Sequence, residues 1–190
     1  MSTAGRRVST GDLQRMKRDR RKIVGVVAWD YQMARIVDRA GVEIVSVGDT
    51  VGVNLWGRSN PLDVTMDEMV LVAQAVRRGV ERALLSCDFP FGPLQEGPAE
   101  AVRAAIRLAR EAGVDMVKLD GAADHPEAVE AVTRAGIPVF AQFGITPQTP
   151  LDGDAMCRWL AQKPAVVSNS CRLLHTARAT TDRPSWANAS

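Results

Sequence analysis

Residues 83–120 have the sequence ALLSCDFPFGPLQEGPAEAVRAAIRLAREAGVDMVKLD. The segment contains two short apolar runs, which end at Asp88 and Asp120. Between them, a loop rich in proline and glycine leads into a helical pattern over residues 98–112, and Gly113 ends that helix. A strand, a helix and a second strand in this order predict a parallel βαβ unit with both acids at strand C-termini.

The alternation of short apolar runs and helical patterns continues on both sides of this segment. The predicted strands are 23–28, 43–47, 83–87, 115–119 and 138–143, and the predicted helices are 10–20, 31–40, 66–79, 98–112 and 126–135. The first strand is expected to be buried. The long loop 48–64 is expected to shape or cover a pocket. This order predicts an α/β fold with five β/α units and a parallel sheet.

A third acid occupies the same kind of position as Asp88 and Asp120. Asp49 ends the run Val45-Ser46-Val47-Gly48-Asp49. Three acids at the C-terminal mouth of a β/α fold would direct their oxygens toward one point, as ligands of a hard divalent cation do. For each acid taken alone, a turn residue or helix cap is the structural alternative. The neighbouring Cys87 is expected to point to the opposite face of its strand and to be buried.

The composition indicates one soluble domain in a reducing compartment. The chain has 190 residues, of which 46% are hydrophobic, 24% charged and 5% aromatic. Its three cysteines are too few and too irregularly spaced for a disulfide framework or a zinc knuckle. The longest early apolar run, residues 23–29, is much too short to cross a bilayer, so we expect a cytoplasmic location and no membrane partner.

The positive charge gathers near the N-terminus. Residues 1–22 contain eight Lys or Arg and two Asp, a net charge of +6, so a total of +2 leaves −4 for the other 168 residues. Such a segment can contact phosphate or form the solvated face of a helix. We favour the helix face, and nucleic acid is not the expected partner.

Several short motifs together resemble one enzyme family. In chain order they are Ala28-Trp29-Asp30-Tyr31, Val47-Gly48-Asp49-Thr50-Val51-Gly52, Ala75-Val76-Arg77-Arg78-Gly79, Asp88-Phe89-Pro90-Phe91, Val117-Lys118-Leu119-Asp120-Gly121 and Gly144-Ile145-Thr146-Pro147-Gln148. Over about residues 10–150 this set resembles the ketopantoate hydroxymethyltransferase family. The resemblance implies a (β/α)8 TIM barrel, here expected to be incomplete, with five to six β/α units in residues 1–150. Residues 151–190 are expected to form an irregular tail.

The resemblance also implies an activity and its small-molecule partners. The expected reaction transfers a hydroxymethyl group from 5,10-methylenetetrahydrofolate to 3-methyl-2-oxobutanoate, which gives ketopantoate for pantothenate biosynthesis. Mg²⁺ or another divalent cation is the expected cofactor, the folate is a co-substrate, and a homo-oligomer is the expected assembly. Mg²⁺ suits such a site because it prefers hard oxygens and needs only one or two carboxylates.

Residue by residue, the resemblance assigns two overlapping sets of ligands. The implied metal ligands are Asp49, Asp88 and Asp120, and the implied substrate-binding residues are Asp49, Thr50, Asp88, Lys118 and Gln142. Three of these differ from the family pattern, since Thr50 replaces a serine, Asp120 a glutamate and Gln142 a histidine. Glutamine can hydrogen-bond but cannot act as an acid or base near pH 7.

No catalytic base is identified in this sequence. The family places a catalytic glutamate in its final third, and the sequence contains no counterpart to that segment. Two alternatives to hydroxymethyl transfer therefore stay open. One is an inactive or weakly active homologue that binds metal and 2-oxoacid or associates with full-length subunits. The other is a carbon–carbon lyase of the phosphoenolpyruvate-binding barrel type.

Overall fold

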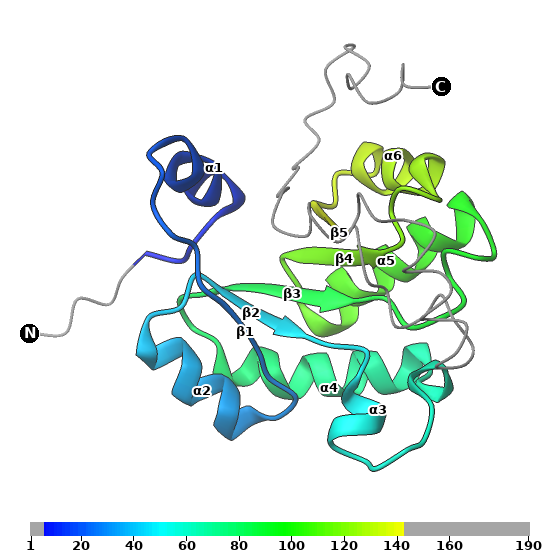
Figure 1. The fold of residues 1–190 in the computed structure, drawn as a ribbon, viewed down its shortest axis with the longest axis horizontal. Coiled ribbons are helices and arrows are strands. Elements are labelled where there is room, and N and C mark those ends of the chain that lie inside the picture. The colour runs from blue at the N-terminus through cyan, green and yellow to red at the C-terminus, as the bar shows by residue number, and fades with distance from the viewer. Residues whose placement is uncertain (1–5, 143–190) are drawn as a thin grey trace, which may run out of the picture.

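The computed structural model describes residues 6–142, which form a parallel five-stranded sheet with helices packed on it (Figure 1). The strands are β1 (Gly25–Val27), β2 (Ile44–Val47), β3 (Leu84–Asp88), β4 (Met116–Asp120) and β5 (Val139–Gln142). The helices are α1 (Thr10–Arg18), α2 (Tyr31–Ala40), α3 (Val51–Asn54), α4 (Met66–Gly79), α5 (Pro98–Ala112) and α6 (Pro126–Arg134), with a 3₁₀ turn η1 (Pro61–Asp63). Within these residues, no helix is both long and apolar enough to cross a membrane.

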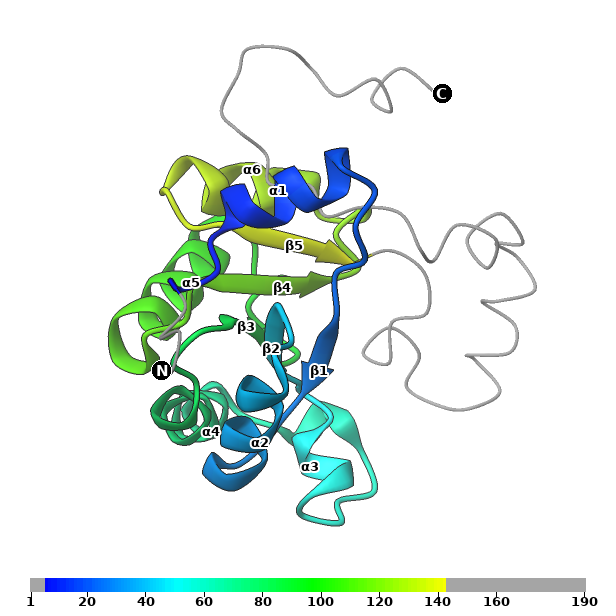
Figure 2. The same cartoon turned by 90° about the vertical axis from the view of Figure 1, so that its left-hand side faces the viewer.

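The strand order identifies the fold as barrel-type. The strands pair as β1-β2-β3-β4-β5, so each new strand is added at the same edge of the sheet. Helix α2 contacts α4, α4 contacts α5 and α5 contacts α6, and Figure 2 shows these helices along the outside of the curved sheet. Such a succession is typical of a (β/α) barrel, whereas a doubly wound sheet reverses its strand order. The predicted α/β barrel class is confirmed, with five parallel strands; a helix after β5 would lie outside the described residues, so the predicted number of five to six β/α units stays a prediction.

Two apolar clusters lie on the two faces of the sheet. The larger cluster packs the outer face against α2, α4, α5 and α6, and Cys87 belongs to it, so the predicted orientation and burial of this thiol are confirmed. The smaller cluster joins Leu13 of α1 to Ile44, Leu84 and Met116 in the first half of β2, β3 and β4. Helix α1 therefore covers the N-terminal end of the inner face, which leaves the C-terminal end for a site.

The basic N-terminal segment forms ion pairs within the chain. Arg6 and Arg15 both pair with Asp12, and Arg7 lies 3.1 Å from the carboxylate of Asp115. Helix α1 buries only its apolar residues Leu13 and Met16. This arrangement is that of a charged helix face on an apolar stripe, as the sequence predicted.

Two expectations about the N-terminal half are wrong in detail. The first strand is not buried, because Gly25 and Val27 are exposed and, within residues 6–142, β1 pairs only with β2. The segment 48–64 is not a continuous loop, because it contains α3 and η1. Local chemistry explains η1, since the Asn60 side chain accepts a hydrogen bond from the Leu62 N–H and Pro61 occupies the first position of the turn.

The predicted tail, residues 151–190, and the motif at 144–148 lie outside the described residues, as do Phe143, Cys157 and Cys171. The division into a barrel region, 1–150, and a tail therefore stays a prediction. The other predicted strands and helices agree with the structure to within about two residues at each end.

A buried carboxylate that the sequence did not single out fixes the start of β3. Asp38 of α2 accepts hydrogen bonds from the backbone N–H groups of Glu81, Arg82 and Ala83, the last at 2.7 Å. Asp38 follows the buried Ala34 by four residues, so it lies on the apolar stripe of α2. This position in the helical pattern could have indicated from the sequence that Asp38 is buried. Asp38 thus ties α2 to the segment that leads into β3, the strand that ends at Asp88.

Gly79 allows α4 to pack closely against α2, and we expect Gly79→Ala to destabilise the chain. A Cβ at residue 79 would lie 2.6 Å from the Tyr31 carbonyl oxygen and 2.8 Å from Ala34 Cβ. Because backbone atoms cannot move aside as a flexible side chain can, the free energy of unfolding should fall by about 1–3 kcal/mol. Urea denaturation followed by circular dichroism measures this loss.

Gly11→Ala is the matched control for this substitution. A Cβ at residue 11 would lie 3.7 Å from the Ser9 hydroxyl and 3.8 Å from the Arg15 guanidinium, which are ordinary van der Waals distances. Since alanine favours a helix more than glycine does, this variant should be at least as stable as the parent chain. Equal stability of Gly79→Ala and the parent would contradict the close α2–α4 contact.

Candidate functional site

Four polar side chains project from one face of the sheet at the C-terminal ends of three strands. Asp88 ends β3, Asp120 ends β4 and Gln142 ends β5, while Lys118 precedes Asp120 by two residues. In the sheet, Asp88 is opposite Lys118 and Asp120 is opposite Gln142. Because side chains alternate along a strand, residues two apart and register partners share a face. Local periodicity and register together therefore place these groups side by side.

Lys118 connects two of the predicted acids. Its Nζ donates hydrogen bonds to Asp88 Oδ2 at 2.5 Å and to Asp120 Oδ1 at 2.9 Å. The three side chains are largely buried, with exposed fractions of 13% for Lys118, 7% for Asp88 and 4% for Asp120. Buried charges persist when they are paired and hydrogen-bonded, so the three groups form one interdependent network.

The network changes the protonation behaviour of Asp88. Burial raises the pKa of Asp88 to about 7, and the like charges of Asp120 and Asp49 act in the same direction against the attraction of Lys118. For Lys118, burial alone would lower the pKa, but the Asp88 and Asp120 carboxylates outweigh it and raise the pKa above its ordinary value. Near neutral pH the site thus holds a stable ammonium beside a carboxyl group that can gain or lose a proton.

The structure places the remaining predicted residues around this network. Asp49 follows β2 and is 3% exposed, and its negative charge contributes to the raised pKa of Asp88. Thr50 is partly exposed at the start of α3, next to Gly48. Gln142 is partly exposed at the end of β5. All the predicted site residues therefore lie at the C-terminal edge of the sheet, and Asp88, Lys118 and Asp120 are joined by hydrogen bonds.

The predicted cluster of three acids is not assembled around one point. Within residues 6–142, no three His, Cys, Asp or Glu residues are grouped closely enough to hold a metal ion. The Lys118 ammonium is bonded to both Asp88 and Asp120, and its positive charge opposes a cation between them. Mg²⁺ commonly uses one or two protein carboxylates together with water and substrate oxygens. Asp49 and Asp88, whose charges interact, are the two acids that could hold such an ion, although Asp88 is also bonded to Lys118.

Two serines beneath Asp88 belong to the site and were missed by sequence reasoning. The Ser46 hydroxyl donates to Asp88 Oδ1 at 3.4 Å. Ser86 lies two residues before Asp88 on β3, opposite Ser46, and is fully buried. The sequence could have indicated Ser86. Side chains alternate along a strand, so Ser86 shares the face of Asp88, while Leu85 and Cys87 point to the opposite, apolar face.

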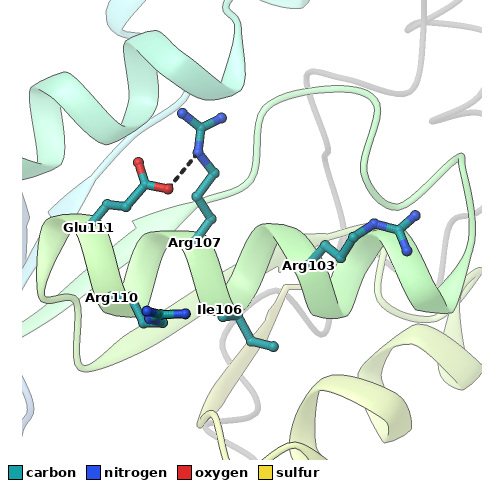
Figure 3. Close-up of a pocket in the computed structure, with 5 residues that line it drawn as sticks. All are labelled: Arg103, Ile106, Arg107, Arg110 and Glu111. Atoms are coloured by element: carbon teal, nitrogen blue, oxygen red, sulfur yellow. Dashed lines mark hydrogen bonds and ion pairs between the residues drawn. The ribbon is translucent and has the colours of Figure 1, made fainter.

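Two surface hollows lie away from the strand ends. One, of about 380 Å³, lies on the outer side of α5 (Figure 3) and is lined by Arg103, Ile106, Arg107, Arg110 and Glu111. A second, of about 270 Å³, borders α1 and includes Arg6, Arg15, Glu43 and Arg82. Neither contains a predicted site residue, so the strand-end network remains the candidate site.

Comparison of the sequence with known families and proteins gives one consistent match. Residues 7–163 match the family model described as ketopantoate hydroxymethyltransferase. The 3-methyl-2-oxobutanoate hydroxymethyltransferase of Salinibacter ruber is 44% identical over 146 residues, which are 77% of this chain and 55% of that protein. The enzyme of the same name from Cyanothece sp. is 45% identical over 75% of this chain and 55% of its own length. The chain thus spans about half the length of these curated relatives.

Solved structures support the barrel fold. A 2,3-dimethylmalate lyase of the PEP mutase/isocitrate lyase superfamily matches with a TM-score of 0.55 and 18% identity, covering 87% of this chain and 60% of that one. An oxaloacetate acetylhydrolase matches with a TM-score of 0.55 and 13% identity, covering 85% and 61%. At these identities the likeness concerns the fold alone. The family match over residues 7–163 is specific, and the chain belongs to the ketopantoate hydroxymethyltransferase family.

Proposed function

We propose that the chain acts in the transfer of a hydroxymethyl group from 5,10-methylenetetrahydrofolate to 3-methyl-2-oxobutanoate, the step that gives ketopantoate. The observation that supports this most is the buried Asp88–Lys118–Asp120 network at the strand ends, inside the segment that matches the family. A cytoplasmic location and a homo-oligomeric assembly belong to the same proposal.

Each side chain has a role that follows from its position. Asp49 and Asp88 would hold Mg²⁺ or another divalent cation, which when bound supplies Lewis acidity toward the keto oxygen of the oxoacid. Lys118 provides a fixed positive charge beside the negative charge that develops when the C3 proton leaves. Asp120 fixes Lys118 through the 2.9 Å hydrogen bond. Thr50 and Gln142 can donate hydrogen bonds to oxoacid oxygens.

A second candidate function is binding of metal and 2-oxoacid without turnover. It is favoured by Gln142 at the end of β5, because a glutamine side chain cannot act as an acid or base near pH 7. Under this alternative, the chain would associate with full-length subunits or act as a binding protein. Carbon–carbon cleavage of an oxoacid is the remaining alternative.

The decisive experiment separates binding, proton removal and transfer. Isothermal titration with Mg²⁺ and 3-methyl-2-oxobutanoate measures binding, and NMR in D₂O measures Mg²⁺-dependent exchange of the C3 proton without folate. Addition of 5,10-methylenetetrahydrofolate then tests for ketopantoate, with EDTA as the control. Ketopantoate formation supports the transferase, and binding without exchange supports the second candidate. Absence of binding contradicts both, and release of pyruvate from an oxoacid would favour the lyase.

A further inference from the structure

We propose that Ser46 and Ser86 hold one buried water molecule beneath Asp88, and that this water fixes the orientation of the Asp88 carboxylate. The two serines would be positioning residues rather than catalytic ones. The water itself follows from the geometry of the sheet, whereas its effect on metal binding rests on the proposed function.

The first argument is the hydrogen bonding of Ser86. Its Oγ is enclosed and has no hydrogen-bond partner among the described residues. Buried polar atoms in folded proteins nearly always have a partner, because an unpaired hydroxyl keeps the full cost of leaving water. Met116, opposite Ser86 on β4, offers only a weak sulfur acceptor, and Leu84 precedes Ser86 by two residues on the same face. A bound molecule is therefore the partner that best satisfies this hydroxyl.

The second argument is the arrangement of polar atoms around Ser86. Ser46 is its register partner on β2, and the Ser46 Oγ lies 3.4 Å from Asp88 Oδ1, which is long for an O–H···O hydrogen bond. The two hydroxyls and Asp88 Oδ1 together provide three polar atoms, about the number that a buried water typically binds. The inner layers of barrels usually consist of bulky branched side chains, so two adjacent serines occupy less volume than the residues usually found there.

The third argument concerns the charge of the ligand. Lys118 Nζ lies 2.5 Å from Asp88 Oδ2, on the other oxygen of the same carboxylate. A neutral water suits the position beneath Oδ1, because it can donate to Oδ1 and accept from a serine hydroxyl, whereas Leu84 and Met116 offer a hard cation no oxygen ligand. With Oδ2 bound by Lys118 and Oδ1 by Ser46 and the water, rotation of the Asp88 carboxylate is restricted.

A double-mutant cycle tests the shared water. We expect Ser46→Ala and Ser86→Ala each to lower the Tm of the full chain by about 2–4 °C. Because both remove a partner of the same water, the double variant should lose clearly less than the sum of the two. Ser59→Ala, at an exposed serine, is the control and should leave the Tm unchanged. A Tm that is unchanged or raised in Ser86→Ala, or losses that add, would overturn the proposal.

Two further measurements keep the inference separate from folding and from the proposed function. A high-resolution crystal structure of the parent chain should show a water within hydrogen-bond distance of both hydroxyls, and a direct Ser46–Ser86 hydrogen bond without water would overturn the proposal. Calorimetric titration with Mg²⁺ should show about tenfold weaker binding in Ser86→Ala. If the parent chain binds no Mg²⁺, the proposed function fails, and the Tm cycle and crystal structure still decide the water.

Discussion

Asp88→Asn is expected to weaken Mg²⁺ binding by more than about 100-fold, beyond the loss typical of an outer-shell change. The substitution keeps the shape of the side chain but removes the charge that a hard cation requires. Asp88 is 5% exposed, so a solvent water cannot readily take the place of its carboxylate as a ligand of the cation. Isothermal titration with Mg²⁺ at pH 8 measures this effect, and the yield of ketopantoate should fall with it if transfer occurs.

The pH dependence of Mg²⁺ binding gives a second signature of Asp88. Because its pKa is raised to about 7, a proton competes with the cation below that pH, and the affinity of the parent chain should fall by about tenfold per pH unit well below 7. Asp88→Asn should lose this dependence around pH 7. Asp67→Asn, at a side chain on α4 that is 80% exposed, is the control and should match the parent. Mg²⁺ binding equal in Asp88→Asn and the parent would contradict the metal assignment.

Lys118→Met is expected to lower the free energy of unfolding by about 3–5 kcal/mol at pH 8, because it leaves two buried carboxylates without their cation. Methionine has nearly the same length and volume, so the loss reports the charge rather than a cavity. The side chains of Asp88 and Asp120 are only 7% and 4% exposed, so solvent cannot hydrate the two unpaired carboxylates. Urea denaturation at several pH values measures the change.

The sign of the pH effect follows from the raised pKa of Asp88. In the folded chain this pKa is about 7, against an ordinary value of 3.8, so the folded state binds the proton more tightly than the unfolded state does. The contribution of Asp88 to stability is therefore fully present below about pH 4 and is lost as the pH rises through 7. Lys118 opposes the upward shift of the Asp88 pKa, so without it the buried Asp88 carboxylate costs more wherever it is ionised. The loss in Lys118→Met should be largest at pH 8 and smaller at pH 5.

Arg134→Met is the matched control for removing a cation. Arg134 lies 3.7 Å from Glu130, and both side chains are about 70% exposed. Exposed pairs contribute little to stability, so this variant should unfold at the same urea concentration as the parent. A loss in Lys118→Met that is independent of pH would mean that Asp88 does not take up a proton in the folded chain.

Much of the fold follows from local patterns in the sequence. Helices α2, α4 and α5 begin or end at residues with a local signal, such as the Thr65–Glu68 capping box of α4 and Gly113 after α5. These signals act over a few residues, so they can be recognised without the rest of the molecule. The exposure of β1 could not be predicted in this way, because burial of an apolar strand depends on which neighbours cover it.

For the candidate site too, local patterns predicted some features, and contacts between distant residues decided the others. Sequence placed Asp88, Lys118 and Asp120 near strand ends, but it treated the acids as three metal ligands and Lys118 as a separate substrate contact. The parallel register of β3 and β4 places Lys118 beside Asp88, thirty residues away in sequence, and so converts two of the acids into partners of the lysine. The roles of Asp38 and Ser86 depend on similar contacts across elements.

The sequence by itself therefore determined the order of the β/α units and the set of polar residues at their ends. These depend on hydrophobic periodicity and on glycine and capping residues, which are properties of neighbours along the chain. The tertiary structure alone decided which of these residues pair, how deeply they are buried and where the Asp88 pKa lies. The physical reason is that electrostatic energies and desolvation depend on distances between residues of different strands, and those distances are set by how the helices pack the sheet.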